Sequence, residues 1–316
     1  MPVVYELFGE RLTKSGDQKG RFRFARCPYM GGRQCDGGGN RDMARWPAHK
    51  QPLAPFFDAS VGKKDGFIPC GICSVIADRS WAICPRRLLA FSSDTPSPEQ
   101  RYLLRRVLKV AGFRKGDIVR VWPEITVVFK TRDERLNYRL DYVMKTDNAA
   151  PVIVEVMTSS TSGGNKAKRS DIQSAFCDAV LYAEGNLPDR GRSPGVNVRQ
   201  VWARMASQMI VKSQIANAWG GRTIWVVQDA LMDYIRSNTG LRLDDLRSPD
   251  WQTGEINVIA ASMDPPDEVR LYSGPVASAH GAACRAELLN TPIVPEVSVL
   301  EDKLTDEKAI GKIVMS

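Results

Sequence analysis

Two acidic residues lie in strand-like runs that are otherwise apolar, and their types and spacing suit chemistry on phosphate. Asp141 lies in the run Tyr138–Tyr142 and Glu155 in the run Pro151–Met157. A carboxylate buried alone in a strand is costly, but two on adjacent strands joined by a short turn can converge. With water and a phosphate oxygen they form the oxygen-only ligand shell that Mg²⁺ prefers. Such a metal activates an attacking water, so the pair predicts Mg²⁺-dependent phosphodiester hydrolysis.

This arrangement is the logic of the PD-(D/E)xK nuclease core, in which an acid on one strand is followed by acid-x-cation on the next. The alternative is that both acids lie on solvated strand faces. The β-branched run Val152–Val154 favours a central strand around Glu155. Glu124 is a candidate third ligand, because Pro123 predicts a strand start or bulge that aims it at the site. A surface glutamate is the alternative reading of Glu124.

The cation of that pattern is missing, because Met157 stands two residues after Glu155. A methionine can neither orient a water nor stabilise developing negative charge. Lys166, beyond the Ser/Thr/Gly-rich loop 158–164, is the nearest substitute, with Lys168 and Arg169 close behind. The same basic run also fits a phosphate-contacting or merely solvated segment.

Five of the seven cysteines fall within the first 84 residues. An odd total, with no export signal, argues against a disulfide scaffold. Clustering indicates a metal site, and four thiolates at tetrahedral distances suit zinc and iron equally. Cys70 and Cys73 form a C-x2-C pair, the usual spacing in such sites. Cys177 and Cys284 read as core or surface thiols.

Composition limits the function classes. The 316 residues are 43% hydrophobic and 25% charged, with a net charge of +8, which predicts a folded protein with a polyanionic partner. No apolar run reaches the roughly 20 residues that span a bilayer. The first 19 residues contain Glu6, Glu10 and Asp17 and lack the apolar region of a secretory signal, so a cytoplasmic protein without membrane contact is expected. The two histidines, His49 and His280, have no triad or metal-site context. No Walker or Rossmann glycine motif is present, so no organic cofactor is expected.

The elements that must position these acids form an α/β pattern. We expect residues 1–93 to be a Cys-rich metal-binding module that contacts DNA, and residues 94–316 to be a nuclease domain with a C-terminal extension. The predicted fold is a mixed sheet flanked by helices. Predicted helices cover residues 101–110, 170–183, 198–218 and 230–237, and predicted strands cover 118–122, 125–130, 139–145, 152–158, 223–228 and 256–262. The residues from Pro265 onward show no clear pattern.

Taken in order, these pieces resemble the NotI group of Type II restriction endonucleases over roughly Glu6 to Asp229. No single piece is specific, and the shared order and spacing carry the resemblance. The matching pieces are Glu6–Gly9, Cys27-Pro28, Cys35, Gly71–Val75, Ile83–Arg87, Trp122–Glu124, the Asp141 strand, Glu155–Thr158, Gly163–Lys166, Gly195–Asn197, Arg204, Gln208-Met209 and Lys212.

The resemblance implies a PD-(D/E)xK fold, a Mg²⁺-dependent cut in double-stranded DNA at a GC-rich palindrome, and a homodimer to match the palindrome. It also implies a structural metal, iron in that family, on Cys27, Cys35, Cys73 and Cys84, with Cys70 as a rival for Cys35. That family typically has Gln two residues after the glutamate, so a non-cationic residue at position 157 is less anomalous. Methionine remains a departure, because it cannot hydrogen-bond a water.

DNA contact is expected from two arginine-bearing regions. The predicted helix 198–218 carries Arg204, Gln208 and Lys212 on the side interpreted as polar. Because these three positions match ones retained in the resembled family, the resemblance implies that the helix lies either at the dimer seam or near DNA. The N-terminal module is dense in arginine, at Arg21, Arg23, Arg26, Arg33, Arg41 and Arg45. Two rival functions remain, a nuclease of DNA repair or transposition with the same core, and a non-catalytic metal-stapled DNA-binding regulator.

Overall fold

The computed structural model describes residues 2–38, 45–47, 53–62, 67–91, 98–130, 135–161, 171–238, 256–263, 269–274 and 296–315. The chain forms two compact units. Unit 1 comprises Met1–Gln100, Thr158–Val201 and Met263–Pro265, and unit 2 comprises Arg101–Met157, Trp202–Ser262 and Pro266–Ser316. The sequence predicted one boundary, at 93/94. The first break between the units falls between Gln100 and Arg101, and the later segment Thr158–Val201 groups with the N-terminal residues.

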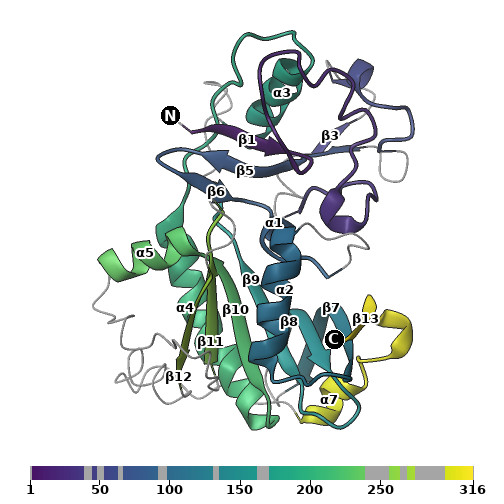
Figure 1. Ribbon diagram of the computed structural model, residues 1–316, viewed down its shortest axis with the longest axis vertical. Helices are drawn as coiled ribbons and strands as arrows, with labels where there is room; N and C mark the ends of the chain where they lie inside the picture. The colour runs from purple at the N-terminus through teal and green to yellow at the C-terminus, as the bar shows by residue number, and fades with distance from the viewer. Residues whose placement is uncertain are drawn as a thin grey trace. The chain divides into compact units, whose positions relative to one another are not determined.

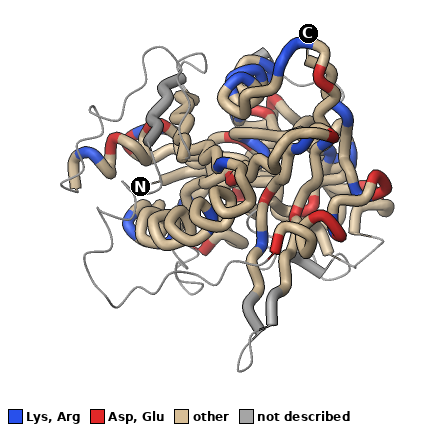
Figure 2. Tube along the Cα trace, turned by 90° about the horizontal axis from the view of Figure 1, so that it is seen from below, with Lys and Arg blue, Asp and Glu red and all other residues tan. Residues whose placement is uncertain are grey.

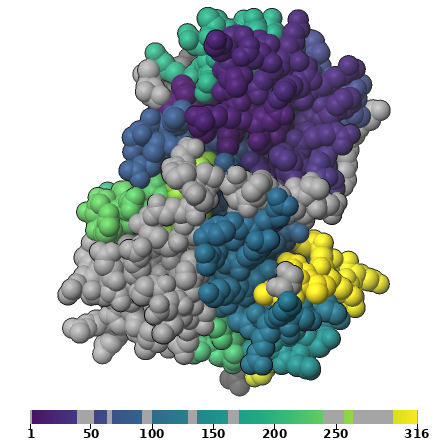
Figure 3. Space-filling view, viewed as in Figure 1, coloured from purple at the N-terminus to yellow at the C-terminus, as the bar shows by residue number. Residues whose placement is uncertain are grey.

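Unit 1 is built on a four-stranded antiparallel sheet in the order β2-β1-β5-β6. Its strands are β1 (Val3–Leu7), β2 (Glu10–Arg11), β5 (Ile72–Ile76) and β6 (Ser80–Ala82), beside a small pair formed by β3 (Arg45–Pro47) and β4 (Phe67–Pro69). Helix α3 (Ile172–Ala183) lies against β1 (Figures 1 and 3). None of these strands was among those predicted from the sequence, because two to five residues are too few to show a period.

Aromatic rings form the core between α3 and this sheet. The ring of Phe8 packs against Phe22, Phe57 and Phe176, with centroids 5.6 to 6.1 Å apart. Gly71 makes this packing possible, because a Cβ there would lie 2.2 Å from the Phe8 ring. The core thus fixes β1 beside the segment that leads into β5. Cys70 lies in this segment, and Cys73 lies in β5 itself.

Unit 2 contains a seven-stranded mixed sheet flanked by helices, in the order β12-β11-β10-β9-β8-β7-β13 (Figure 1). Strands β9, β10 and β11 are parallel, and every other neighbouring pair is antiparallel. The strands are β7 (Ile118–Lys130), β8 (Arg135–Lys145), β9 (Val152–Met157), β10 (Arg222–Gln228), β11 (Ile256–Ala261), β12 (Val269–Gly274) and β13 (Gly311–Val314). Among the described residues, the α-helices that lie wholly or mostly in unit 2 are α2 (Pro98–Ala111), α4 (Val198–Ala218), α5 (Asp229–Asn238) and α7 (Val297–Glu301). The short helix α1 (Pro85–Leu88) belongs to unit 1.

Helix α4 packs on the centre of this sheet, because its residues Ile215 and Ala216 share one buried cluster with Val143 and Ile153. Trp219, just after the helix, belongs to the same cluster. Strand β9 is buried along nearly its whole length, as expected of a central strand whose two faces are both covered. The predicted helix 198–218 and the predicted strands of this unit are confirmed. One difference is that β7 runs unbroken through Pro123, where the sequence predicted two strands.

The C-terminal residues, which the sequence left without a pattern, complete the sheet. Strand β13 pairs with β7, and the Trp122 indole N–H donates to the Thr305 carbonyl at 2.7 Å. Ion pairs add to this attachment, as Lys145 meets Glu301 at 2.7 Å and Arg120 meets Asp306 at 2.9 Å. Acidic and basic residues occur close together along much of the chain trace (Figure 2). Among the described residues, no helix has the length and apolarity needed to cross a bilayer.

Candidate active site

Asp141 and Glu155 lie where β8 and β9 separate. The strands pair at Met144 with Val152, Val143 with Ile153 and Tyr142 with Val154, and continuing this register places Asp141 opposite Glu155. Side-chain bonds replace the ladder at that point. The Val156 N–H donates to Asp141 Oδ2 at 3.0 Å, and the Asp141 N–H donates to Glu155 Oε1 at 3.4 Å. The two carboxylates therefore occupy the gap between the strands, as the sequence predicted.

Lys212 of α4 completes the group. Its Nζ lies 2.5 Å from Glu155 Oε2, and the two residues are 8% and 2% exposed. The ammonium nitrogen also lies 6.0 Å from the ring centroid of Trp225, which is paired in register with Glu155 on β10. The sequence interpretation placed Lys212 on the polar side of its helix, and this was wrong. It belongs to the buried side, seven residues after buried Met205, and this helical spacing is the signal that could have identified it.

Burial controls the charge of Glu155. Loss of solvent, and next the negative charge of Asp141, raise the pKa of Glu155 to about 8, although Lys212 acts in the opposite direction. The carboxylate therefore holds a proton at neutral pH unless a further cation approaches. A divalent cation would supply that charge, so the chemistry of these oxygen donors fits Mg²⁺.

Glu124 lies on the strand beside Asp141. The pairs Pro123–Tyr142 and Ile125–Leu140 flank it, and the same register sets Glu124 opposite Asp141. Its φ of +49° is a left-handed conformation that costs a glutamate energy. Its carboxylate contacts Arg139 at 3.0 Å in an exposed ion pair. The backbone thus brings Glu124, Asp141 and Glu155 to one level of three neighbouring strands, while the Glu124 side chain contacts Arg139.

Cys27, Cys35 and Cys73 pack together in unit 1, Cys84 interacts with this group, and Cys70 interacts with Cys84. Cys27 and Cys35 form a side-chain hydrogen bond, which lowers the pKa of the Cys27 thiol. Burial raises the pKa of Cys73, and the charges of Cys84 and Cys27 raise it further. The hydrogen bond with Cys27, burial and the charge of Cys73 raise the pKa of Cys35. Burial raises the pKa of Cys84 to about 11 and that of Cys70 to about 12. The only cysteine among the main influences on Cys70 is Cys84.

Backbone groups surround these sulfur atoms. The Gly9 N–H donates to Cys73 Sγ at 3.2 Å, and the Gly37 N–H to Cys35 Sγ at 3.4 Å. Gly38 approaches Cys84 so closely that a Cβ there would lie 2.6 Å from its Sγ. Still, no group of three or more His, Cys, Asp or Glu side chains within the described ranges is arranged to hold a metal ion. The structure shows buried, mutually interacting thiols and no formed metal centre.

Most of the remaining basic residues that the sequence analysis singled out lie either outside the described residues or in contacts within the N-terminal module. Lys166, with Lys168 and Arg169, lies outside the described residues, as does Arg41. Arg21 pairs with Glu10 at 2.7 Å and Arg23 with Asp58 at 3.5 Å. The guanidinium groups of Arg26 and Arg33 donate to nearby carbonyls of Gly32 and Met30. These four arginines are thus engaged within the N-terminal module.

The chain matches no protein-family model, and no curated protein matches it. The resemblance to the NotI group therefore stays a prediction, and the local geometry of the two acids and the lysine is the basis for assigning a function.

Proposed function

We propose that this protein is a Type II restriction endonuclease of the NotI kind, which hydrolyses phosphodiester bonds of double-stranded DNA with Mg²⁺ at a specific sequence. One observation carries the proposal. Asp141 and Glu155 occupy the gap where β8 and β9 separate, and the ammonium of Lys212 contacts Glu155. Two acids and a cation on a diverging strand pair are the elements of a PD-(D/E)xK site.

Each residue has a distinct role in this proposal. Asp141 and Glu155 would hold Mg²⁺, which when bound polarises the scissile phosphate and acidifies an attacking water. Val156 orients Asp141 through its N–H. Lys212 supplies positive charge close to the reacting phosphate, the function that Met157 cannot perform. Glu124 would assist after leaving Arg139, and Lys166 is an additional candidate cation.

Further features of the proposal rest on the resemblance. Cys27, Cys35, Cys73 and Cys84 would hold a structural iron or zinc, and their mutual interactions favour Cys35 over Cys70 as the fourth ligand. A homodimer in the cytoplasm, acting in restriction-modification at a GC-rich palindrome, is part of the same proposal.

Digestion of a plasmid of known sequence, with purified protein and Mg²⁺, tests the activity. Discrete fragments are expected, and mapping their ends gives the cleaved sequence. Asp141→Ala and Glu155→Ala should abolish cleavage while DNA binding persists, because each removes a ligand and leaves the remaining protein surface unchanged. Full cleavage by either variant would overturn the assignment of that residue. A DNA shift on a native gel without cleavage by the wild type would favour the non-catalytic DNA-binding regulator.

A further inference from the structure

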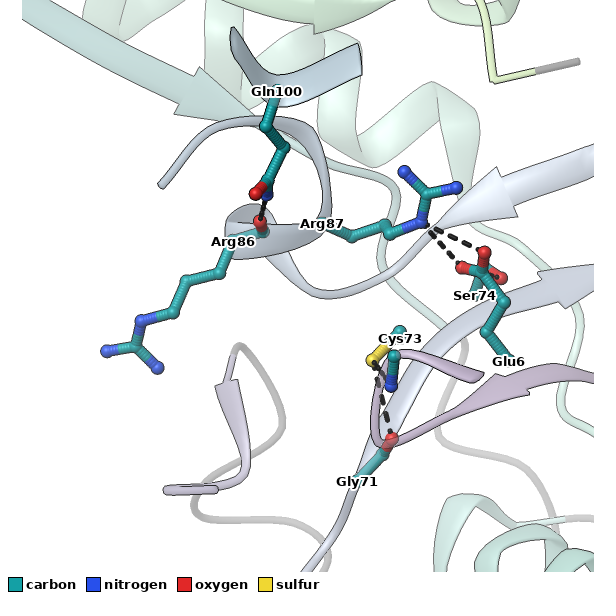
Figure 4. Close-up of polar contacts among 8 residues, drawn as sticks. Glu6, Gly71, Cys73, Ser74, Arg86, Arg87 and Gln100 are labelled. Carbon is teal, nitrogen blue, oxygen red and sulfur yellow. Dashed lines mark hydrogen bonds and ion pairs between the residues drawn. The ribbon is translucent and has the colours of Figure 1, made fainter. Parts of the chain in front are cut away.

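Arg87 of α1 differs from the other arginines of unit 1 in how it is held. Its Nε donates to both carboxylate oxygens of Glu6, at 3.0 and 2.8 Å. Glu6 is itself fixed from β5, because the Ser74 hydroxyl donates to its Oε2 at 2.7 Å. The guanidinium carbon lies 5.9 Å from the ring centroid of Tyr29. One side of the guanidinium is thus held by residues from three segments of the same unit, of which Glu6 and Ser74 are seen in Figure 4.

The other side of the Arg87 guanidinium makes no hydrogen bond to the part of the chain that the structure describes. Its two terminal nitrogens lie away from Glu6, as Figure 4 shows, and neither makes a hydrogen bond with any described residue. Neither nitrogen is among the fully buried, unsatisfied atoms of the described residues, and the side chain is 18% exposed. A rigid pair of N–H donors is therefore presented to solvent at a fixed angle.

We propose that Arg87 is a base-reading residue that donates to the two acceptors, O6 and N7, on the major-groove edge of a guanine. This inference rests on the proposed function, since it assumes that DNA is the partner. The guanidinium fork matches the spacing of these two acceptors. Glu6, Ser74 and Tyr29 hold the fork in advance, so little side-chain freedom is lost on binding.

The combined charge of Arg87 and Glu6 favours contact with a base over contact with a phosphate. Glu6 is 6% exposed and neutralises Arg87, so the pair has little net charge to attract a phosphate. A neutral acceptor pair gains from the orientation of the donors and does not need their charge. Free exposed arginines and lysines serve phosphate contact better, since that interaction is electrostatic.

Selection from a random-sequence duplex library tests the proposal, using the full chain with Ca²⁺ in place of Mg²⁺. The variants are Arg87→Lys, which keeps the charge but not the fork, and Glu6→Gln, which keeps the shape but frees the arginine. The matched control is Arg79→Ala, which removes an exposed arginine of the same unit that pairs with Asp78 next to it. Melting temperature and metal content establish that each variant is folded.

We expect Arg87→Lys to lose a guanine preference of roughly five- to a hundredfold at one position of each half-site. The slope of affinity against salt should stay the same, because no phosphate contact is lost. Glu6→Gln should weaken the same preference, and Arg79→Ala should retain the wild-type profile. An unchanged profile for Arg87→Lys overturns the proposal. An equal loss on all sequences with a reduced salt slope also overturns it, in favour of a phosphate contact.

A measurement on the wild type avoids dependence on the folding of the variants. Replacing each guanine of the selected duplex in turn by 7-deazaguanine removes the N7 acceptor. One position should lower wild-type affinity, and Arg87→Lys should be insensitive to the same change. If no position lowers wild-type affinity, Arg87 does not read guanine, although the nuclease proposal stands. If the wild type enriches no sequence, both proposals fail.

Discussion

A buried glutamate in contact with a buried lysine is costly to ionise, because each ion would lose much of its hydration. Lys212 and Glu155 form such a pair, next to a second acid, Asp141. A purely structural pair gains nothing from the extra negative charge. A site that receives a metal and a phosphate gains from the second acid, because the two acids bind the cation and the lysine faces the anion.

The position of Lys212 predicts loss and rescue of cleavage. Lys212→Met should lower the rate of the chemical step about 100- to 1000-fold, since a group that stabilises transition-state charge is lost. Met157 lies two residues after Glu155 on the same strand face, so adding Met157→Lys should restore part of the rate. Single-turnover cleavage of saturating DNA measures both effects.

Lys109→Met is the matched control for Lys212→Met, because Lys109 is an exposed lysine of the same unit. It should leave the single-turnover rate unchanged. Wild-type cleavage by Lys212→Met would show that the ammonium has only a structural role. A double variant as slow as Lys212→Met would limit the role to a lysine placed on α4.

The pKa of Glu155, about 8, predicts that Mg²⁺ affinity depends on pH. Below that value the metal must displace a proton, so affinity should rise up to about tenfold per pH unit from pH 6 to 8 and then level off. Titration calorimetry in buffers of different ionisation enthalpy measures affinity and proton release together. Glu155→Gln should abolish the proton release, and equal wild-type affinity at pH 6 and pH 8 would contradict the prediction.

The raised pKa of Glu155 also determines how the stability of the metal-free protein changes with pH. The folded pKa lies above the ordinary value of 4.5, so the folded protein keeps a proton that the unfolded chain has lost. This contribution to the free energy of unfolding is fully present below about pH 4.5 and is lost as the pH rises through 8. Added Mg²⁺ should therefore stabilise the protein most at alkaline pH.

At the scale of elements, the site depends on interruptions in the sheet. Strand β7 runs unbroken in sequence, yet Glu124 takes a left-handed φ in the middle of it, directly opposite Asp141. Strands β8 and β9 pair for three residues and separate at the next position. A regular ladder would place a backbone hydrogen bond where the acids need space, so these irregularities make room for chemistry.

Strain and function at Glu124 can be separated by two variants. Glu124→Gly should leave stability unchanged or raise it by up to about 1 kcal/mol, because glycine adopts the left-handed conformation at no steric cost. Glu124→Gln keeps the strain and should leave stability unchanged. Both should reduce cleavage if the carboxylate assists at the metal.

Denaturant unfolding and cleavage assays on both Glu124 variants measure these effects. A clear loss of stability in Glu124→Gly would mean that contacts of the side chain, such as that with Arg139, outweigh the backbone strain. Undiminished cleavage in both variants would remove Glu124 from the site.

At the scale of the whole molecule, unit 1 is rich in buried thiols that a metal would join. Its strands are short, and several loops lie between its cysteines. Burial keeps Cys70, Cys73 and Cys84 protonated, because their pKa values are raised. A metal would replace these protons and connect segments that are distant in sequence.

Two cysteine variants test this arrangement. Cys73→Ser should abolish the bound iron or zinc and lower the melting temperature, because one of four ligands is lost. Cys70→Ser should keep the metal, since Cys70 lies beside the proposed ligands without joining them. Elemental analysis of the purified proteins, with thermal unfolding, gives both results. Loss of the metal from Cys70→Ser but not from Cys35→Ser would exchange their roles.

The sequence by itself determined the elements whose apolar pattern is long and regular. The helix at 198–218 and the strand that carries Glu155 were predicted with nearly correct bounds, because long apolar patterns reflect buried faces. The strand that carries Asp141 was predicted from residue 139, although β8 begins at Arg135. The convergence of the two acids also followed from the sequence, since a short turn joins their strands. The short strands of unit 1 did not, because two to five residues are too few to show a period.

Only the tertiary structure decided which cation meets Glu155 and how Arg87 is held. Lys212 follows Glu155 by 57 residues and Arg87 follows Glu6 by 81. Contacts over such separations depend on how helices and strands pack. Local spacing can indicate that Lys212 lies on a buried helix face, but it does not indicate which residue it contacts there. The same holds for β13, which closes one edge of the sheet that begins with β7 far earlier in the chain. The acids were visible in the sequence because they are local, and their partners were not because packing brings them together.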